Sequence, residues 1–266
     1  MPGDFVVGIY YPWLDYKWDG FPAGVPIKNL ATNDVASYIY PIQSYAIGLL
    51  KEAKLPLWNS NILSGTPLFG NFQSAPFAFT NFLYFIFSNV TAWSLQVVLQ
   101  HLFAATFTYL LLRHWKVSKT GSILGGIIFA FSGFMMIWSQ WKGLPLSASL
   151  IPLVIFFESK FIRQMKFRFG LGFVLALFLQ MLSGYPQVVI YTLLTAGIFW
   201  VATVFRSKNW KFLTFFLFLF VVLALGLASF QILPGFELLS LSQRLIEKTT
   251  FDWAFLPWVK VITFIQ

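Results

Sequence analysis

The sequence predicts an all-α protein, a polytopic bundle of transmembrane helices with interfacial helices in a large outer loop. Three observations support this fold class. Of the 266 residues, 58% are apolar and only 10% are charged, whereas an average soluble domain is about 45–50% apolar and about 25% charged. Several apolar stretches are long enough to cross a bilayer. The few charges gather in the loops between those stretches.

Six stretches are predicted to span the membrane. The hydrocarbon core of about 30 Å takes roughly 20 mostly apolar helical residues. The stretches that approach this length are residues 92–112, 120–138, 144–161, 169–184, 187–205 and 212–233. A further apolar run, 77–87, is too short to cross and follows Pro76. We expect it to form an interfacial helix at about 77–88, or a lead-in to the first span, with a break before that span.

Basic residues alternate from one connecting loop to the next. Three short loops, after the first, third and fifth spans, hold ten of the eighteen Lys and Arg residues, while the opposite loops hold only Lys142. Cytoplasmic loops carry such an excess. The net charge of +9 therefore indicates membrane orientation and not a nucleic-acid-binding face. It predicts that residues 1–90 and 234–266 lie on the non-cytoplasmic side.

The sequence thus divides into three predicted parts. They are a non-cytoplasmic first outer loop (1–90), a transmembrane bundle of six helices (91–233) and a second non-cytoplasmic segment (234–266). No apolar segment before residue 90 could carry the outer loop across a membrane, and no signal peptide precedes it. The chain stops inside an apolar run, 255–265. We therefore expect a fragment of a longer protein, with one more transmembrane helix upstream and a truncated C-terminal segment.

Several function classes are excluded by residue types and motifs that the sequence lacks. With no cysteine, it forms no disulfide, cysteine-ligated zinc site, iron–sulfur cluster or catalytic thiol. Nucleotide-binding glycine loops and the motifs of zinc proteases and serine hydrolases are absent. Inside the spans, Gln96 and Gln100 share a helix face. We expect them to hydrogen-bond between packed helices, with a substrate path as the alternative. Glu158 lies near a cytoplasmic helix end, where we expect its carboxylate to snorkel to water.

The outer loop combines an amphipathic helix with an irregular segment. Residues 37–53 have apolar positions near one face and charges at the end, a pattern typical of a helix lying in the membrane interface. Residues 54–77 contain three prolines, two glycines and three asparagines, which predicts a loop without regular helix or strand. A loop held by a rigid scaffold is a common place for function, and a plain interfacial connector is the alternative.

Four segments carry a resemblance to a known family. Residues 33–77, NDVASYIYPIQSYAIGLLKEAKLPLWNSNILSGTPLFGNFQSAPF, resemble the first outer loop of bacterial YfhO-like membrane proteins. Three later segments match the same family in order: FAFSGFMM (129–136), SGYPQ (183–187) and QILPGFELLSLSQR (231–244). This family is similar to the integral-membrane glycosyltransferases of the GT-C superfamily. The resemblance implies transfer of a sugar (hexosyl transfer) from a polyprenyl-phosphate carrier to an extracytoplasmic acceptor, a cell-envelope glycan or lipid, at the bacterial plasma membrane.

The predicted site residues all lie in the outer segments. Asp34 matches the acidic residue of the family's first outer loop and is the predicted catalytic base, with helix N-capping as the alternative. Arg244 is the predicted phosphate ligand, with an ion pair to Glu247 or a headgroup contact as the alternative. The predicted substrate-binding residues are Gln43, Asn59, Gln73, Gln187, Glu237 and Arg244.

Cofactors and partners follow from the same reasoning. A lipid-linked sugar phosphate is already activated, so no nucleotide cofactor is needed. Asp34 stands without an adjacent acidic partner such as in Asp-x-Asp. No metal ligand is therefore assigned, and a divalent metal stays open. The expected partners are the lipid-linked sugar and membrane lipids, without nucleic acid. The alternative functions are a non-enzymatic flippase or transporter of the lipid carrier and a scaffold for envelope assembly.

Overall fold

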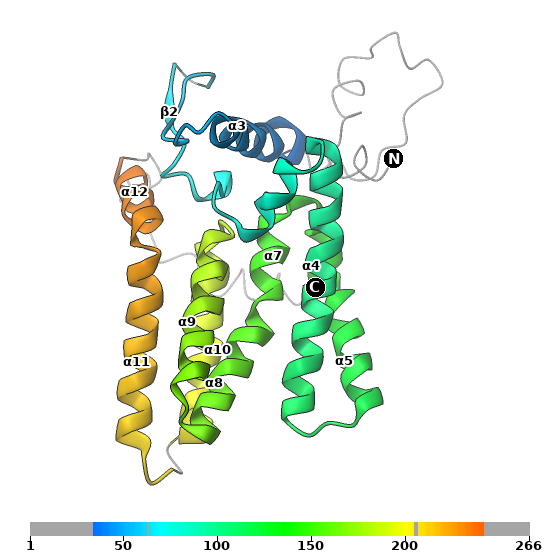
Figure 1. Cartoon of the computed structure of the whole chain (residues 1–266), viewed down its shortest axis with the longest axis vertical. Helices are drawn as coiled ribbons and strands as arrows, with labels where there is room; N and C mark the ends of the chain where they lie inside the picture. Colours follow the sequence, from blue (N-terminus) through cyan, green and yellow to red (C-terminus); the bar gives the residue numbers. More distant parts are fainter. Residues whose placement is uncertain (1–33, 63, 205–206, 242–266) are drawn as a thin grey trace, which may run out of the picture.

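Figure 1 shows the computed structural model of the chain, in which residues 34–62, 64–204 and 207–241 are described. Long helices run side by side, and α3 (Tyr40–Lys51) lies across one end of them. We call residues 34–87 the outer lobe. The α4–α5 and α8–α9 connections and the start of α11, all within basic segments of the sequence, lie at the end of the bundle opposite α3 (Figure 1). The predicted alternation of loop charge therefore corresponds to two opposite ends of the bundle.

Four helical segments are long and apolar enough to span a membrane. They are α4 (Asn89–His114), the segment Gly143–Gln164 that joins α7 (Gly143–Ser149) to α8 (Ile151–Gln164), α10 (Pro186–Val204) and α11 (Trp210–Leu227). The predicted count of six spans is not confirmed. Two predicted spans are shorter helices, α5 (Lys119–Ala130) and α9 (Phe167–Leu182).

The second predicted span, 120–138, is interrupted at Ser132. The side chain of Ser132 accepts a hydrogen bond from the backbone N–H of Met135 and so caps a new helix, α6 (Gly133–Ile137). Serine favours this position because its hydroxyl satisfies an N–H that has no partner inside the helix. A 3₁₀ turn, η5 (Ser139–Trp141), follows α6. The apolar run is therefore divided into α5 and two short turns at the outer end.

The first predicted span begins after a break, as expected. A 3₁₀ helix, η4 (Phe79–Phe85), takes the place of the predicted interfacial helix at 77–88. Ser88 then caps α4 by accepting a hydrogen bond from the backbone N–H of Thr91 at 3.3 Å. Residues 77–112 thus contain a 3₁₀ helix and the first part of an α-helix, with a break between them. Of the two, only α4 runs along the bundle.

The outer lobe begins with helix and continues as an irregular loop. A π-helical turn, η2 (Val35–Ile39), runs directly into α3, so the predicted 37–53 helix is present and starts earlier. The following segment contains two short strands, β1 (Trp58–Asn59) and β2 (Thr66–Pro67), which pair antiparallel. The prediction of no strand between 54 and 77 was wrong for these four residues. A short 3₁₀ helix, η3 (Phe72–Ser74), follows.

The chain re-enters the outer end of the bundle in α12 (Ser229–Ser240). The predicted boundary between the bundle and the second outer segment, at 233/234, falls inside this helix. Residues 1–33 and 242–266 lie outside the described part of the chain. The predictions for the ends of the protein and for Arg244 and Glu247 lie there with them.

Side chains pack closely between the helices of the bundle. Phe161 of α8 and Phe220 of α11 meet edge to face at 5.0 Å between ring centroids. Gln180 of α9 donates to the Ser147 carbonyl of α7 and the Thr192 hydroxyl of α10, both at 2.8 Å. Because lipid tails are as apolar as the side chains, close packing and such interhelical hydrogen bonds hold membrane helices together.

The α4–α5 contact depends on a glycine. A Cβ added at Gly126 would lie 2.6 Å from the carbonyl oxygen of Ala105, which is closer than real Cβ contacts allow. We therefore expect Gly126→Ala to force the two helices apart and to cost about 1–3 kcal/mol, the usual range for overpacking. Thermal unfolding in lipid nanodiscs measures this loss as a lower melting temperature.

Gly197 of α10 is the matched control for this prediction. A Cβ there meets no atom within 4 Å, so Gly197→Ala is expected to leave stability unchanged or to raise it by up to about 1 kcal/mol through helix propensity. Equal melting temperatures for the two variants would contradict the close α4–α5 approach.

Candidate functional site

Three segments that are distant in the sequence meet where the outer lobe rests on the bundle. A Cβ added at Gly70 would lie 2.5 Å from the Pro234 carbonyl oxygen of α12, and one at Gly184 would lie 2.5 Å from the Phe72 carbonyl oxygen. A Cβ at Gly235 would enter the Phe72 ring. Gly184 also has φ of +92°, a conformation that only glycine adopts readily. These glycines let loop 70–75, turn 183–187 and α12 come into contact.

The remaining family-like segment, 129–136, lies at the same place. Met135 of α6, which is fully buried, packs in one apolar cluster with Tyr185 and Val188. Gly143, at the start of α7, lies against the same turn, because a Cβ there would be 2.6 Å from the Ser183 carbonyl oxygen. The described parts of the four family-like segments, 34–77, 129–136, 183–187 and 231–241, are therefore neighbours at the outer end of the bundle.

Hydrogen bonds tie α3 to loop 70–75. Gln43, 1% exposed, donates from Nε2 to the main-chain oxygen of Gln73 at 2.9 Å. Asn71 accepts a hydrogen bond from the Gln73 backbone N–H at 3.1 Å and donates from Nδ2 to the Tyr38 hydroxyl. Within the described residues the Oε1 atom of Gln43 is buried without a partner. The structure thus brings two of the predicted substrate-binding residues, Gln43 and Gln73, together.

Asp34 stands at the start of this helix without capping it. Its φ and ψ, −54° and −29°, are already helical, and its side chain makes no capping hydrogen bond. A capping residue has non-helical backbone angles and accepts a bond from the first turn, so the capping alternative does not describe Asp34 here. Its side chain is exposed.

Tyr185 links Asp34 to the turn beneath it. Burial is the main reason why the pKa of the Tyr185 hydroxyl is raised above its usual range; the Gln73 side chain opposes the rise, and the charge of Asp34 adds to it. The hydroxyl makes no hydrogen bond of good geometry within the described residues. Asp34, Gln73 and Tyr185 therefore form a polar cluster around a phenol that stays protonated at neutral pH.

The other predicted residues lie apart from this cluster. Asn59, 3% exposed, accepts a hydrogen bond from the Asn61 backbone N–H at 3.0 Å in the outer hairpin. Gln187 is exposed and donates to the Tyr191 hydroxyl of its own helix at 2.6 Å. Glu237 is exposed on α12 and makes no ion pair within the described residues. The structure therefore does not bring Gln187 or Glu237 into the polar cluster.

Lys142 is a candidate functional residue that sequence reasoning treated only as a marker of topology. It is 1% exposed, and its Nζ donates to Asn81 Oδ1 at 3.2 Å. The same ammonium lies 5.0 Å from the ring centroid of Tyr84 and 5.1 Å from that of Trp93. Gln96 also donates to Asn81 Oδ1, at 3.1 Å. The sequence feature that could have identified Lys142 is a single lysine in a short loop among aromatic residues.

Among the described residues, no carboxylate pairs with Lys142. The part of the chain that the structure describes has one ion pair, Lys54–Glu52 at 2.7 Å, on the exposed outer loop. Cation–π contacts are worth about 0.5–2 kcal/mol each and replace only part of the lost hydration. Burial lowers the pKa of Lys142 to about 7, and burial raises that of Tyr84. Lys142 is thus a group of the described residues that changes charge close to neutral pH.

Glu158 of α8 contradicts the snorkelling prediction. It is 0% exposed, and neither carboxyl oxygen has a hydrogen-bond partner within the described residues. Val154 and Phe161, on the same side of α8, belong to the apolar core shared with α9 and α11. The helix turns this position inward, so the carboxyl group cannot reach water by extending along the surface.

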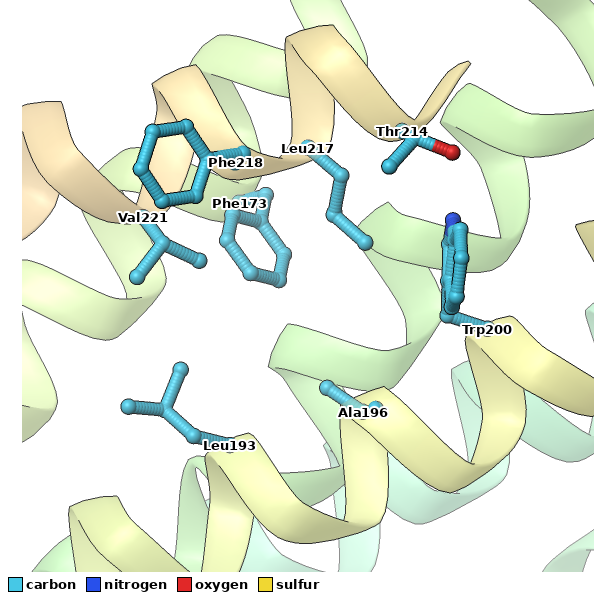
Figure 2. Close-up of a pocket in the computed structure, with 9 residues that line it drawn as sticks. Phe173, Leu193, Ala196, Trp200, Thr214, Leu217, Phe218 and Val221 are labelled. Carbon is cyan, nitrogen blue, oxygen red and sulfur yellow. The ribbon is translucent and has the colours of Figure 1, made fainter. Parts of the chain in front are cut away.

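The cavity in Figure 2 is apolar. It has a volume of about 220 Å³ and lies between α9, α10 and α11. Phe173, Leu193 and Leu217 point into it (Figure 2). The hydroxyl of Thr214 at its edge donates to the Trp210 carbonyl of the same helix at 2.6 Å. No set of polar groups converges on this space, which therefore suits a lipid chain and not a reaction.

The polar cluster and the apolar helices define the class of protein that the structure supports. Four helices able to cross a bilayer are consistent with a helical membrane protein that carries an outer lobe at one end. Within the described residues, no three His, Asp or Glu side chains gather in a way that could hold a metal. Comparison of the chain with protein-family models, curated proteins and solved structures found no match.

We predict that Lys142 makes stability depend on pH. The unfolded chain keeps this proton up to a pKa of about 10.4, whereas the folded chain releases it near pH 7. The unfolded state binds more protons between these values, so folding stability rises with pH in this window. One pKa unit corresponds to about 1.4 kcal/mol, which sets an upper limit of about 5 kcal/mol for the rise.

Lys142→Met tests this prediction. Melting temperatures measured from pH 6.5 to pH 10 should rise with pH in the wild type and stay flatter in the variant. Lys116, which is exposed, supplies the control Lys116→Met, expected to follow the wild-type profile. A Lys142→Met profile that parallels the wild type would show that the buried ammonium does not titrate in this range.

Proposed function

We propose that the chain is part of a membrane glycosyltransferase-like protein of the GT-C type, which transfers a sugar from a polyprenyl-phosphate carrier to an extracytoplasmic glycan or lipid. The observation that carries the proposal is the meeting of all four family-like segments at one end of the bundle. Loop 70–75, turn 183–187 and α12 touch through glycines, and α6 joins them through Met135. Segments with no common structural task have no reason to converge in this way.

The chemistry of the cluster supports transfer to a hydroxyl group. In an inverting reaction the acceptor oxygen bonds to the anomeric carbon, the bond from that carbon to the phosphate oxygen breaks, and the lipid phosphate leaves with the electron pair. The hydroxyl proton must pass to a base. Asp34 is exposed and is not used as a helix cap, which suits it to that role. Arg244, predicted to bind the departing phosphate, lies outside the described residues.

The proposal includes a membrane orientation. The outer lobe lies at one end of the bundle and the basic connections at the other (Figure 1). Since basic loops stay in the cytoplasm, we place the outer lobe on the non-cytoplasmic side of a bacterial plasma membrane. A lipid-linked donor would enter from the surrounding bilayer and present its sugar to the outer lobe.

We predict that Asp34→Asn abolishes most transfer. A general base contributes typically 10²–10⁴-fold, and asparagine keeps the size of the side chain without its basicity. The measurement is transfer from a polyprenyl-phosphate sugar by the membrane-reconstituted protein, with folding followed by thermal unfolding. Glu52→Gln is the matched control, because Glu52 is an exposed acid of the same lobe that pairs only with Lys54 among the described residues. Near-normal turnover in Asp34→Asn would overturn the assignment.

A second candidate function, transport of the lipid carrier without catalysis, is favoured by Glu158. An ionisable side chain buried inside a membrane bundle is a functional-site hypothesis by default, and Glu158 is fully buried without a partner in the described residues. It lies in the middle of α8. A transporter would need such a group along its path, whereas a transferase acting at the outer lobe would not.

Glu158→Gln separates the two functions. We expect this variant to keep sugar transfer and to melt at the same or a higher temperature, because it removes a buried group that is costly to ionise. Movement of a fluorescent polyprenyl phosphate across proteoliposomes is measured in parallel. Loss of such movement together with the absence of transfer in the wild type would support the transporter instead.

A further inference from the structure

The outer lobe encloses a second cavity, with a volume of about 200 Å³. Its walls come from η2 and α3, from the β1–β2 hairpin with the loop that follows it, and from Leu238 of α12. Two of these parts, the loop that contains Asn71 and α12, also belong to the contact that holds the outer lobe on the bundle. It lies at the end of the molecule that the proposed orientation exposes to the outside.

The polar groups in this cavity are all uncharged. They are the phenol of Tyr38, the amides of Asn59 and Asn71 and the hydroxyl of Thr66. Asn59 and Thr66 are paired across the hairpin, so their side chains are held next to each other by the backbone. Asn71 donates to the Tyr38 hydroxyl, which leaves the phenol proton for another acceptor. The rest of the wall is aliphatic, including Ile42 and Leu238.

The volume of this cavity and the chemistry of its lining indicate which kind of ligand it can bind. Pockets for drug-sized molecules measure roughly 300–1,000 Å³, so this cavity admits one ring and not a long chain. A charged ligand would find no charged partner there and would pay the cost of desolvation. An isoprenyl or acyl chain would leave the two amides and the hydroxyls unpaired, which is also costly. A sugar ring has an apolar C–H face and a rim of hydroxyl groups, which matches both kinds of wall.

The cavity is also next to the proposed catalytic group. Tyr38 follows Asp34 by one helical turn in η2. Residues four apart lie on the same face of a helix, so a ring held against Tyr38 would lie on the face that carries Asp34.

We propose that this cavity binds a neutral sugar ring, and, as a step that rests on the proposed function, that this ring belongs to the acceptor whose hydroxyl Asp34 deprotonates. The acceptor is accordingly a neutral glycan or glycolipid.

Binding is tested without catalysis. The chain is reconstituted in lipid nanodiscs free of sugar-based detergent, and equilibrium dialysis measures binding of radiolabelled methyl β-D-glucopyranoside and methyl β-D-galactopyranoside. Glucose 1-phosphate serves as the charged probe and cyclohexanol as the apolar ring. We expect saturable binding of at least one of the two neutral glycosides, with weaker binding of both comparison probes.

A double variant, Tyr38→Phe with Thr66→Val, removes two hydroxyl groups and keeps the shape of the cavity. Two hydrogen bonds of the usual strength together account for roughly a 5- to 150-fold difference in affinity, so binding should weaken at least about fivefold. The control is Thr195→Val, the same chemical change at an exposed position on α10. Wild-type affinity in the double variant, no saturable binding of either glycoside, or equal or tighter binding of glucose 1-phosphate or cyclohexanol would each overturn the proposal.

The Asp34→Asn variant keeps this test separate from the proposed function. It should bind the glycoside as the wild type does and still fail to transfer sugar. Normal transfer in Asp34→Asn with intact glycoside binding would refute the catalytic assignment and leave the binding site standing. Loss of transfer in Asp34→Asn, with unchanged binding in the double variant, would refute the site alone.

Discussion

The outer lobe depends on backbone contacts that three glycines permit. Gly70 meets the Pro234 carbonyl, Gly184 meets the Phe72 carbonyl, and Gly235 meets the Phe72 ring. Any side chain at these positions would separate the surfaces by the width of a methyl group or more. With the surfaces apart, α12 could not line the cavity of the outer lobe, and turn 183–187 could not lie near Asp34. The polar cluster is therefore a consequence of close packing between distant segments.

Buried amides strengthen the same contact. Gln43 holds loop 70–75 through a main-chain oxygen, and Gln96 of α4 holds η4 through the hydroxyl of Thr80 at 2.9 Å. Gln100 reaches the Ser139 carbonyl at 2.9 Å. In each pair a side chain from one element satisfies a polar group of another, which is what a site with little water requires. The predicted interhelical role of Gln96 and Gln100 is confirmed in this form, because their partners lie in η4 and η5.

Two buried ionisable side chains differ from these amides. Lys142 has one amide oxygen and two aromatic faces around it, and Glu158 has no partner within the described residues. Lys142 lies near the outer lobe and Glu158 in the middle of α8. Unpaired charges cost free energy on burial, so a fold keeps them where they contribute something besides stability. Lys142 lies beside the proposed site of transfer, while Glu158 is the feature that a transport function would need.

Helix positions could be predicted well from local rules. The break before α4 follows from Pro76 and from the capping hydroxyl of Ser88. The division of the second apolar run also has a local cause, the cap at Ser132, although hydropathy alone gave no sign of it. The candidate site was less predictable, because Gln187 is the same residue type as Gln43 and Gln73, and only the latter two lie against each other.

The sequence by itself determined that the chain is helical, apolar and asymmetric in charge between the two ends of its bundle. These properties are local: an apolar stretch must satisfy its own backbone hydrogen bonds in lipid, and helix formation does so within each stretch. Only the tertiary structure decided which polar side chains are buried and which meet. Lys142 and Glu158 could each have faced water, and Asp34 could have capped its helix. Their surroundings are set by segments that are distant in the sequence. The approach of those segments depends on packing, which no single stretch of the sequence determines.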